Sequence, residues 1–186
     1  MRILVLGSGA REHAIFLAFA AGQAGHEILA APGNAGIAND ATIVDLNPND
    51  PAAVTTFAKE RAVDLVVIGP DAPLVAGAAD ALRAHGSPVV GPGKAAAQLE
   101  GSKTFAKRIM DAAGVPTGRA ARAATREDVE RTLAEFGAPY VVKADGLAAG
   151  KGVIVTEDLA AALAHADEFL PAGAVLVEEF LAGPEV

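Results

Sequence analysis

The chain has 186 residues and a formal net charge of −8, and 52% of its residues are hydrophobic against 20% charged. This composition is typical of a folded globular protein and excludes disordered and collagen-like chains. The chain has no cysteine, which excludes a disulfide scaffold, a thiolate zinc site and a cysteine nucleophile. The acidic net charge and the 4% aromatic residues offer neither the basic surface nor the stacking side chains that nucleic-acid binding requires.

The N-terminal apolar run, residues 1–7, is too short for the core of a signal peptide. No stretch approaches the ~18 apolar residues of a membrane span. We therefore expect a cytoplasmic protein without a membrane or nucleic-acid partner.

The first 93 residues alternate short β-branched segments with alanine-rich helical segments, which is typical of βαβ units that build a parallel sheet. Strands are predicted over residues 3–6, 27–31, 64–68 and 88–90. Helices are predicted over residues 12–21, 50–59 and 74–84. Ligands in an open α/β sheet bind at the carboxyl ends of the strands, so the turns that follow these strands are candidate site loops.

The pattern changes near residue 100, where we place a boundary between domains of residues 1–100 and 101–186. Ser102 and Thr125 are placed to cap helices that run to about Ala113 and to Phe136. A further helix is predicted over 159–169. Strand-like segments over 140–143, 153–155 and 174–180 indicate a small antiparallel sheet. No closing element follows the last strand, so we expect the natural chain to continue.

A glycine loop, Gly7-Ser8-Gly9, follows the first strand and leads into a helix. Its amides and the helix N-terminus can hold an anion, and Arg11 in the first turn can reach a phosphate. NAD is disfavoured because Glu12 stands where the dinucleotide fingerprint has its third glycine, and no acidic residue ends the second strand. A tight turn without a ligand is the alternative interpretation.

Two further turns at the same edge of the sheet carry polar side chains. Asn34 follows the second strand and Asp71 follows the third, and both side chains offer acceptors for sugar hydroxyls. Each alone would be only a turn. Together with the glycine loop they favour a phosphorylated sugar over an apolar ligand.

A second glycine-rich loop, residues 146–152, lies between two predicted strands. It is not a Walker loop, because only three residues separate Gly146 from Gly150 and Gly152 stands where Ser or Thr is needed. We predict a flap over phosphates, with Lys143 and Lys151 supplying the charge. A glycine-rich hairpin with two solvated lysines is the alternative.

The backbone of residues 178–181 could pair with an adenine edge and Glu185 with ribose hydroxyls. Alternatively, the adjacent glutamates are simply exposed, because neighbouring residues of a strand point to opposite faces. His26, His85 and His165 have no partners at ligand spacing, so no metal site is predicted in the chain.

Five segments in register carry a resemblance that spans residues 1–186. They are GSGAREHA from Gly7, APGNAG from Ala31, GPDAPLV from Gly69, QLEGSK from Gln98 and VKADGLAAGKGV from Val142. Together they resemble the phosphoribosylamine-glycine ligase (glycinamide ribonucleotide synthetase) family of purine biosynthesis, within the ATP-grasp superfamily. The family usually has Asn, Gly and Glu where this chain has Ser8, Ala10 and Asp71, so the sugar-phosphate contacts depart slightly from its pattern.

The resemblance implies an α/β architecture: a doubly wound parallel-sheet, Rossmann-like domain, followed by part of an ATP-grasp module with a small antiparallel sheet. It also implies a reaction that uses ATP with Mg²⁺ or Mn²⁺. Glycine is phosphorylated to glycyl phosphate, which the amine of 5-phosphoribosylamine attacks to give glycinamide ribonucleotide, ADP and phosphate. The implied partners are these two small molecules, and we expect a monomer.

The resemblance also implies the site residues. For 5-phosphoribosylamine they are Gly7, Ser8, Gly9, Arg11, Glu12, Asn34, Gly36, Asp71 and Pro73. For ATP they are Lys103, Lys143, Gly146, Gly150, Lys151, Gly152, Glu178, Leu181 and Glu185. The first two lysines would hold phosphates, the backbone of Glu178 and Leu181 would meet adenine, and Glu185 would hold the ribose.

No catalytic or metal-binding residue is assigned within the chain, since the family's metal ligands and glycine site are expected beyond residue 186. The isolated chain is therefore expected to bind ATP weakly and to make no product. Two alternatives remain. Another ATP-grasp ligase or a biotin-dependent carboxylase would keep the flap without the Gly7 loop. A non-catalytic nucleotide-binding module would bind NAD or AMP, and stabilisation by NADH rather than by Mg-ATP would distinguish it.

Overall fold

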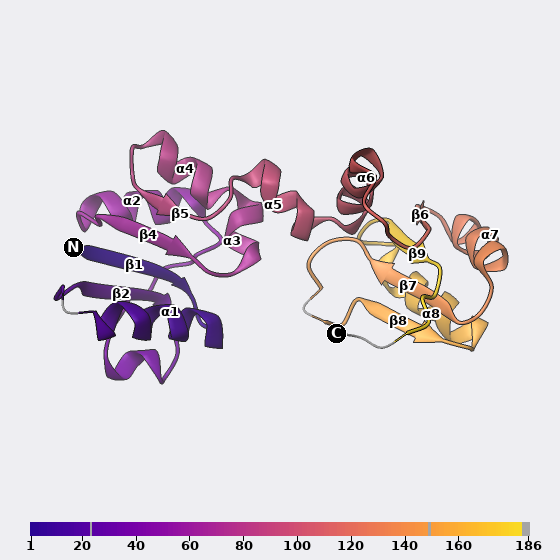
Figure 1. The fold of residues 1–186 in the computed structure, drawn as a ribbon, viewed down its shortest axis with the longest axis horizontal. Helices are drawn as coiled ribbons and strands as arrows, with labels where there is room; N and C mark the ends of the chain where they lie inside the picture. Colours follow the sequence, from indigo (N-terminus) through magenta and orange to yellow (C-terminus); the bar gives the residue numbers. More distant parts are fainter. Residues whose placement is uncertain (23, 149, 184–186) are drawn as a thin grey trace. The chain divides into compact units, whose positions relative to one another are not determined.

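The computed structural model describes residues 1–22, 24–148 and 150–183 (Figure 1). The chain divides into two compact units, Met1–Gln98 and Leu99–Val186. Among the described residues, no helix is long and apolar enough to cross a membrane.

The first unit is built on a five-stranded sheet with the order β3-β2-β1-β4-β5. Its strands are β1 (Arg2–Gly7), β2 (Glu27–Pro32), β3 (Thr42–Ile43), β4 (Leu65–Ile68) and β5 (Val89–Val90). All four pairings are parallel. The chain starts at the centre of the sheet and adds strands outward on both sides, which confirms the predicted doubly wound α/β arrangement.

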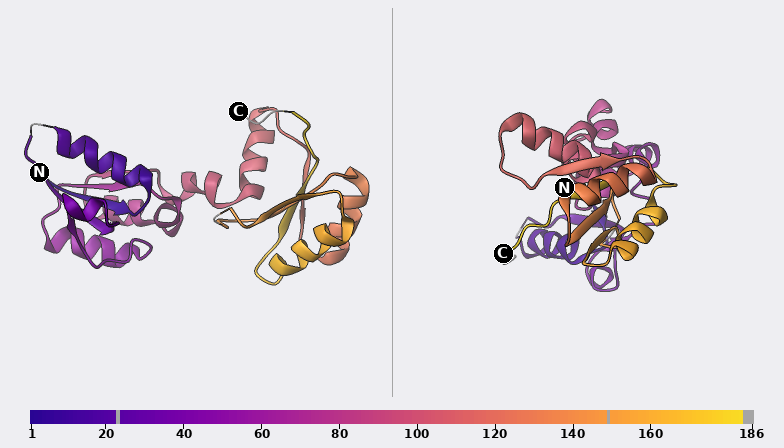
Figure 2. Two further views of the ribbon diagram at one scale, coloured as in Figure 1. Left: turned by 90° about the horizontal axis from the view of Figure 1, so that it is seen from below. Right: turned by 90° about the vertical axis from the view of Figure 1, so that its right-hand side faces the viewer.

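Helices cover both faces of this sheet (Figure 2). They are α1 (Ala10–Ala21), the short 3₁₀ helix η1 (Ile37–Asn39), α2 (Pro51–Glu60), α3 (Asp71–Ala76) and α4 (Ala78–Ala84). On β1, Leu4 and Leu6 pack against α2 and α4, whereas Ile3 and Val5 pack against Phe16 of α1. A strand buried on both faces has no polar side, and this explains why residues 3–6 of β1 are all apolar.

The prediction of one continuous helix over residues 74–84 is wrong. This segment forms two helices, which are separated at Gly77, whose φ of 101° lies in the left-handed region. The first of them, α3, begins earlier than predicted, at Asp71. The Gly77 amide donates to the carbonyls of Pro73 and Leu74, which ends α3. A further helix, α5 (Lys94–Gly101), was not predicted, and the boundary between the two units falls within it.

The second unit contains a four-stranded antiparallel sheet with the order β6-β9-β7-β8. Its strands are β6 (Ala120–Ala123), β7 (Tyr140–Ala144), β8 (Val153–Thr156) and β9 (Val175–Glu178), and its helices are α6 (Lys103–Ala113), α7 (Arg126–Phe136) and α8 (Leu159–Phe169). The predicted small antiparallel sheet is confirmed. Strand β6 was not predicted, and β9 is shorter than the segment 174–180.

The side-chain alternation of this sheet positions the site. Val142 and Val177 point to the face that α7 and α8 cover, where they join the core with Val129 and Leu133. Successive residues of a strand point to opposite faces. The residues that follow these two valines, Lys143 and Glu178, therefore lie on the face away from α7 and α8.

The predicted caps of the second unit are confirmed. The Ser102 hydroxyl accepts from the Phe105 amide at the start of α6, and Thr125 accepts from the Asp128 amide at the start of α7. The Asp128 carboxylate accepts from the Ala124 amide at 3.3 Å. These local bonds satisfy helix N-terminal amides that would otherwise lack partners.

Candidate functional site

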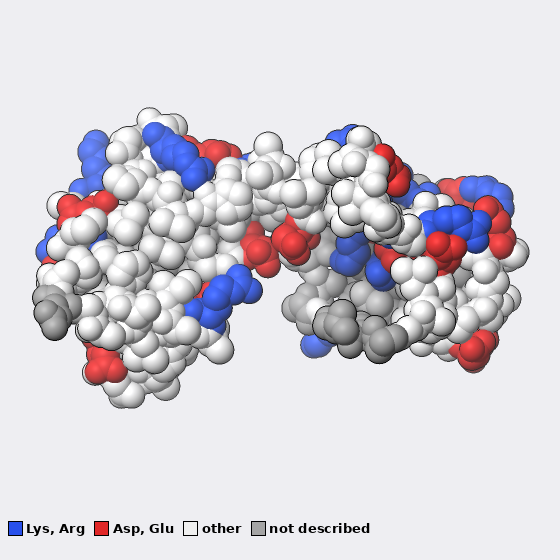
Figure 3. Space-filling view, in the orientation of Figure 1, with Lys and Arg blue, Asp and Glu red and all other residues white. Residues whose placement is uncertain are grey.

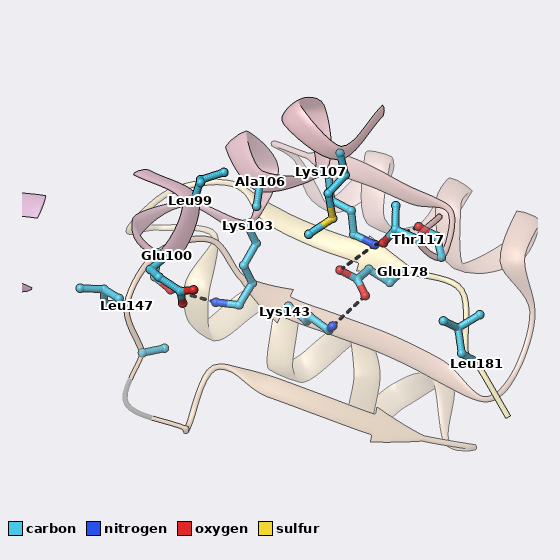
Figure 4. Close-up of a pocket in the computed structure, with 14 residues that line it drawn as sticks. Leu99, Glu100, Lys103, Ala106, Lys107, Thr117, Lys143, Leu147, Glu178 and Leu181 are labelled. Atoms are coloured by element: carbon cyan, nitrogen blue, oxygen red, sulfur yellow. Dashed lines mark hydrogen bonds and ion pairs between the residues drawn. The ribbon is translucent and has the colours of Figure 1, made fainter. Parts of the chain in front are cut away.

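A pocket of about 480 Å³ lies in the second unit, between α6, the loop after β7 and the segment that follows β9 (Figure 4). We call it the lysine pocket, because Lys103, Lys107 and Lys143 line it. In the space-filling view, basic side chains are recessed in a hollow of this unit (Figure 3). Most of the remaining wall is apolar, with Leu99, Met110, Leu147 and Leu181 among its residues.

Five of the residues expected at ATP line this pocket: Lys103, Lys143, Gly146, Glu178 and Leu181. Three others, Gly150, Lys151 and Gly152, do not line it. Gly152 instead belongs to the hairpin, where its carbonyl accepts from the Ala144 amide at 2.6 Å. A Cβ at Gly152 would lie 2.5 Å from that of Ala148, so this glycine permits a close approach within the loop. Glu185 lies outside the described residues.

The Lys103 side chain bonds to the backbone at the start of the glycine-rich loop. Its Nζ donates to the carbonyls of Ala144 and Gly146, both at 2.9 Å. An ammonium group has three donors, so one remains for a ligand. The first turn of α6 is thus tied to the start of the glycine-rich loop.

Asp145 makes a further connection between the glycine-rich loop and the first turn of α6. Its carboxylate accepts from the Ser102 hydroxyl at 3.2 Å and from the Thr104 amide at 3.3 Å. Burial raises the pKa of Asp145, but the hydrogen bonds from Thr104, Ser102 and Lys103 together outweigh burial and leave the pKa below its ordinary value. The carboxylate is therefore held ionised against the N-terminus of α6, where the helix dipole also favours negative charge.

Glu178 lies between two lysines of the pocket, as the dashed lines of Figure 4 show. Its Oε2 is 2.7 Å from Lys143 Nζ, and its Oε1 is 3.6 Å from Lys107 Nζ. Lys107 also donates to Thr117 Oγ1 at 2.7 Å and to the Gly118 carbonyl at 2.9 Å. The Glu178 side chain is only 13% exposed, so this carboxylate depends on its cationic partners.

The lysine pocket combines excess positive charge with an apolar wall. Three lysines line it against the two carboxylates of Glu100 and Glu178. Such a cavity suits a ligand with an anionic chain and a flat apolar group. Sequence reasoning missed Lys107, although its position four residues after Lys103 places both on one face of α6.

A second pocket, of about 470 Å³, lies in the first unit at the carboxyl ends of β1, β2 and β4. We call it the Gly-loop pocket. Five residues expected at the sugar phosphate line it: Gly7, Ser8, Gly9, Glu12 and Pro73. Arg11, Asn34, Gly36 and Asp71 are not part of its lining. Pro48 and Asn49 also line the pocket, but the sequence analysis did not predict them. They follow β3, a strand that the sequence pattern does not reveal.

The Glu12 side chain bonds within its own loop. It is 4% exposed, and its Oε2 accepts from the Gly9 amide at 2.7 Å. Its side chain occupies the space beside Gly7 and Gly69, where a Cβ would collide with it. The Gly9 amide, expected to face a phosphate, is therefore already bonded to a carboxylate of the same loop.

The remaining predicted residues of this unit connect the rim loops to one another. Asn34 donates through Nδ2 to the Ser8 carbonyl at 3.0 Å and accepts at Oδ1 from the Ile37 amide at 2.9 Å. Arg11 donates to the Gly69 carbonyl. Asp71 is the half-buried first residue of α3.

Gly36 allows a close approach, because a Cβ there would lie 2.6 Å from Cε1 of His13. With Asn34 bonded to Ser8, the turn after β2 is fixed against the glycine loop. The rim loops of the Gly-loop pocket are thus joined to one another by their own side chains.

Comparison with known proteins gives two family matches. Residues 1–100 match the model described as "Phosphoribosylglycinamide synthetase, N domain", and residues 101–186 match "Phosphoribosylglycinamide synthetase, ATP-grasp (A) domain". Two similar curated proteins are phosphoribosylamine-glycine ligases. The one from Leifsonia xyli is 71% identical and the one from Streptomyces coelicolor 54% identical, each over 100% of this chain. The chain spans 45% and 44% of their respective lengths.

Solved structures agree with these matches. The phosphoribosylamine-glycine ligase of Thermotoga maritima aligns with a TM-score of 0.77 and 35% identity, covering 99% of this chain and 45% of that one. An ADP complex of N5-carboxyaminoimidazole ribonucleotide synthetase aligns with a TM-score of 0.73 over 97% of this chain and 47% of that one. At 21% identity, the second likeness shows the fold alone.

Proposed function

Because the chain belongs to the phosphoribosylglycinamide synthetase family, we propose that it is the N-terminal part of a phosphoribosylamine-glycine ligase. This ligase joins glycine to 5-phosphoribosylamine in purine biosynthesis, with ATP as the phosphoryl donor and glycyl phosphate as the intermediate. The products are glycinamide ribonucleotide, ADP and phosphate. The chain spans less than half of the length of its curated relatives, and we propose that alone it does not complete the reaction.

The observation that carries the proposal is the arrangement of lysines around the lysine pocket. Lys143 has one described partner, Glu178, and Lys103 has two backbone partners, so both retain N–H donors for phosphate oxygens. The apolar wall suits adenine, with the backbone of residues 178–181 as its polar edge. Phosphoryl transfer depends mainly on positioning and on charge neutralisation, which lysines and loop amides can supply.

The glycine-rich loop of residues 146–152 would cover the phosphates, with Gly150, Lys151 and Gly152 contacting ATP after the loop closes. Glu185 would hold the ribose. Mg²⁺ or Mn²⁺ would neutralise phosphate charge when bound. The described residues contain no group of three His, Asp or Glu side chains that could hold a metal ion, so we propose metal ligands in the part of the relatives that this chain does not span.

The first unit would hold 5-phosphoribosylamine at the Gly-loop pocket. The pocket lies at the carboxyl edge of a doubly wound sheet, where such folds bind their ligands. Ser8 and Arg11 would meet the phosphate, and Asp71 the sugar hydroxyls. We further propose a cytoplasmic monomer that acts on small molecules and engages neither membrane nor nucleic acid.

Ligand-dependent stability tests the proposal. Mg-ATP should raise the unfolding temperature of the chain and NADH should not, because a ligand stabilises only the state that binds it. Lys143→Ala should abolish the effect of Mg-ATP. Lys59→Ala, at an exposed position on α2 of the first unit, is the matched control and should keep it. Stabilisation by NADH instead would favour a nucleotide-sensing module.

A further inference from the structure

Lys107 differs in its bonding from the other two lysines of the lysine pocket. Its Nζ donates to Thr117 Oγ1 at 2.7 Å and to the Gly118 carbonyl at 2.9 Å, and it lies 3.6 Å from Glu178 Oε1. Two of its three donors are thus used in hydrogen bonds to the pocket wall, and Glu178 Oε1 lies within ion-pair distance of the same ammonium group. Lys107 lines the pocket, yet its donors are directed to the protein rather than to a ligand.

The shared partner, Glu178, has a constraint of its own. Its side chain is 13% exposed, and its nearest cation is Lys143, at 2.7 Å. Removing the only partner of a largely buried carboxylate is strongly unfavourable, because the charge is then neither solvated nor paired. If Lys143 turns its ammonium group toward a phosphate, Glu178 needs a second cation that stays in place.

We propose that Lys107 is a positioning residue that keeps Glu178 paired while Lys143 transfers to the phosphate chain of the nucleotide, an inference that rests on the proposed function. Its bonds to Thr117 and Gly118 anchor it to the pocket wall. It therefore remains with Glu178 when Lys143 leaves. Glu178 is thus paired with both lysines before the nucleotide binds and with Lys107 alone afterwards. Lys107 thereby lowers the free-energy cost of separating Lys143 from Glu178.

The proposal distinguishes ligands by their phosphates. Mg-ATP requires Lys143 to leave Glu178, whereas adenosine occupies only the apolar part of the pocket and leaves the ion pair intact. Loss of Lys107 should therefore weaken the binding of Mg-ATP and spare the binding of adenosine. A purely structural role of Lys107 would affect both ligands alike.

Isothermal titration calorimetry on four proteins tests this: the wild type, Lys107→Met, Glu178→Gln and the double variant. Loss of one positive charge near a triphosphate weakens Mg-ATP in either background. With Glu178 present, Lys107→Met should weaken Mg-ATP about tenfold more than with Gln at position 178. Equal losses in the two backgrounds, or an equal loss for adenosine, would overturn the proposal.

A nucleotide-free measurement separates this inference from the proposed function. Acetic anhydride labels lysines according to the availability of the amine, and mass spectrometry of the peptide that contains residue 143 gives its rate. Lys107→Met should slow labelling of Lys143 severalfold, because Glu178 then binds Lys143 alone, and the effect should vanish with Gln at position 178. Wild type that binds neither Mg-ATP nor adenosine would contradict the proposed function. An unchanged labelling rate in Lys107→Met would contradict the present inference.

If Lys107→Met does not fold, the Glu178→Gln variant alone tests the proposal, by the same labelling and titration measurements. It should speed the labelling of Lys143 and tighten Mg-ATP, since Lys143 is then free at no cost to a buried carboxylate. A labelling rate equal to that of the wild type would overturn the proposal.

Discussion

The two pockets differ in whether they hold a pair of charged side chains bonded to each other. In the first unit, Glu12 and Asn34 bond to backbone amides and carbonyls of neighbouring loops. In the second unit, Lys103 likewise bonds to backbone carbonyls, but Lys143 and Glu178 bond to each other. A side chain bonded to the backbone fixes the shape of a loop, whereas a pair of charged side chains can exchange partners. We therefore expect the Gly-loop pocket to keep its shape on binding and the lysine pocket to change its pairing.

Glu12→Ala gives the largest effect expected from this comparison. The variant removes a buried side chain, leaves the Gly9 amide without its acceptor and opens space beside Gly7 and Gly69. We expect a loss of about 2–4 kcal/mol in the free energy of unfolding of the first unit. Hydrogen exchange of the β1 amides reports this unit. Glu60→Ala, at an exposed position on α2, is the control and should cost less than about 0.5 kcal/mol.

Asn34→Ala should give the next largest effect. It removes the bonds to Ser8 and Ile37, and the half-buried position allows water to replace part of them. We expect a loss of about 1–2 kcal/mol by the same hydrogen-exchange measurement. A loss of ligand affinity with unchanged stability would instead show that Asn34 contacts the ligand directly and would break the contrast between the pockets.

Acid should destabilise the second unit through Asp145. Its pKa is lowered in the folded state, so its contribution to stability is present above its unfolded pKa of about 3.9. That contribution is lost as the pH falls through the folded pKa. The chain has one Tyr and no Trp, and Tyr140 lies in β7, so tyrosine fluorescence follows the unfolding of this unit. Asp145→Asn should flatten the pH dependence below about pH 4.

Lys151→Ala should have the smallest effect. Its side chain is exposed and does not line the lysine pocket, so the stability of the unit without ligand should not change. If the loop closes over phosphates as proposed, affinity for Mg-ATP should fall about two- to fivefold, as expected for one exposed charge. Titration with Mg-ATP measures this, and a loss as large as that of Lys143→Ala would mean that Lys151 is a principal phosphate ligand.

Local chemistry explains which parts of the fold could be predicted from the sequence. Ser102 and Thr125 cap helices through bonds to amides three residues ahead, and the buried residues 3–6 of β1 are all apolar. By contrast, β6 has the sequence Ala-Ala-Arg-Ala, which has little intrinsic strand preference and becomes a strand through its pairing with β9. Strand β3 has only two residues, too few for a periodic signal.

Among the site residues too, those set by local sequence could be predicted and those set by distant contacts could not. Glycine-rich turns after strands pointed to half of the residues that line the Gly-loop pocket, and Lys143 was expected from its place before a glycine-rich loop. The partners of these residues could not be read from the sequence. Lys107 matters because it meets Glu178, which lies far along the chain. Similarly, nothing local indicates that Glu12 folds back onto Gly9 rather than facing solvent.

The space that Glu12 occupies makes four positions depend on one another. A Cβ at Gly7, Gly9 or Gly69 would meet the Glu12 side chain. A substitution at any of these glycines must therefore displace a buried carboxylate from its place, while a shorter residue at position 12 would relieve the collision. In a saturation library, harmful substitutions at Gly9 or Gly69 should become milder when Glu12 is already replaced. The two loops would thus evolve as a single epistatic block, in which the order of mutations decides which of them are tolerated.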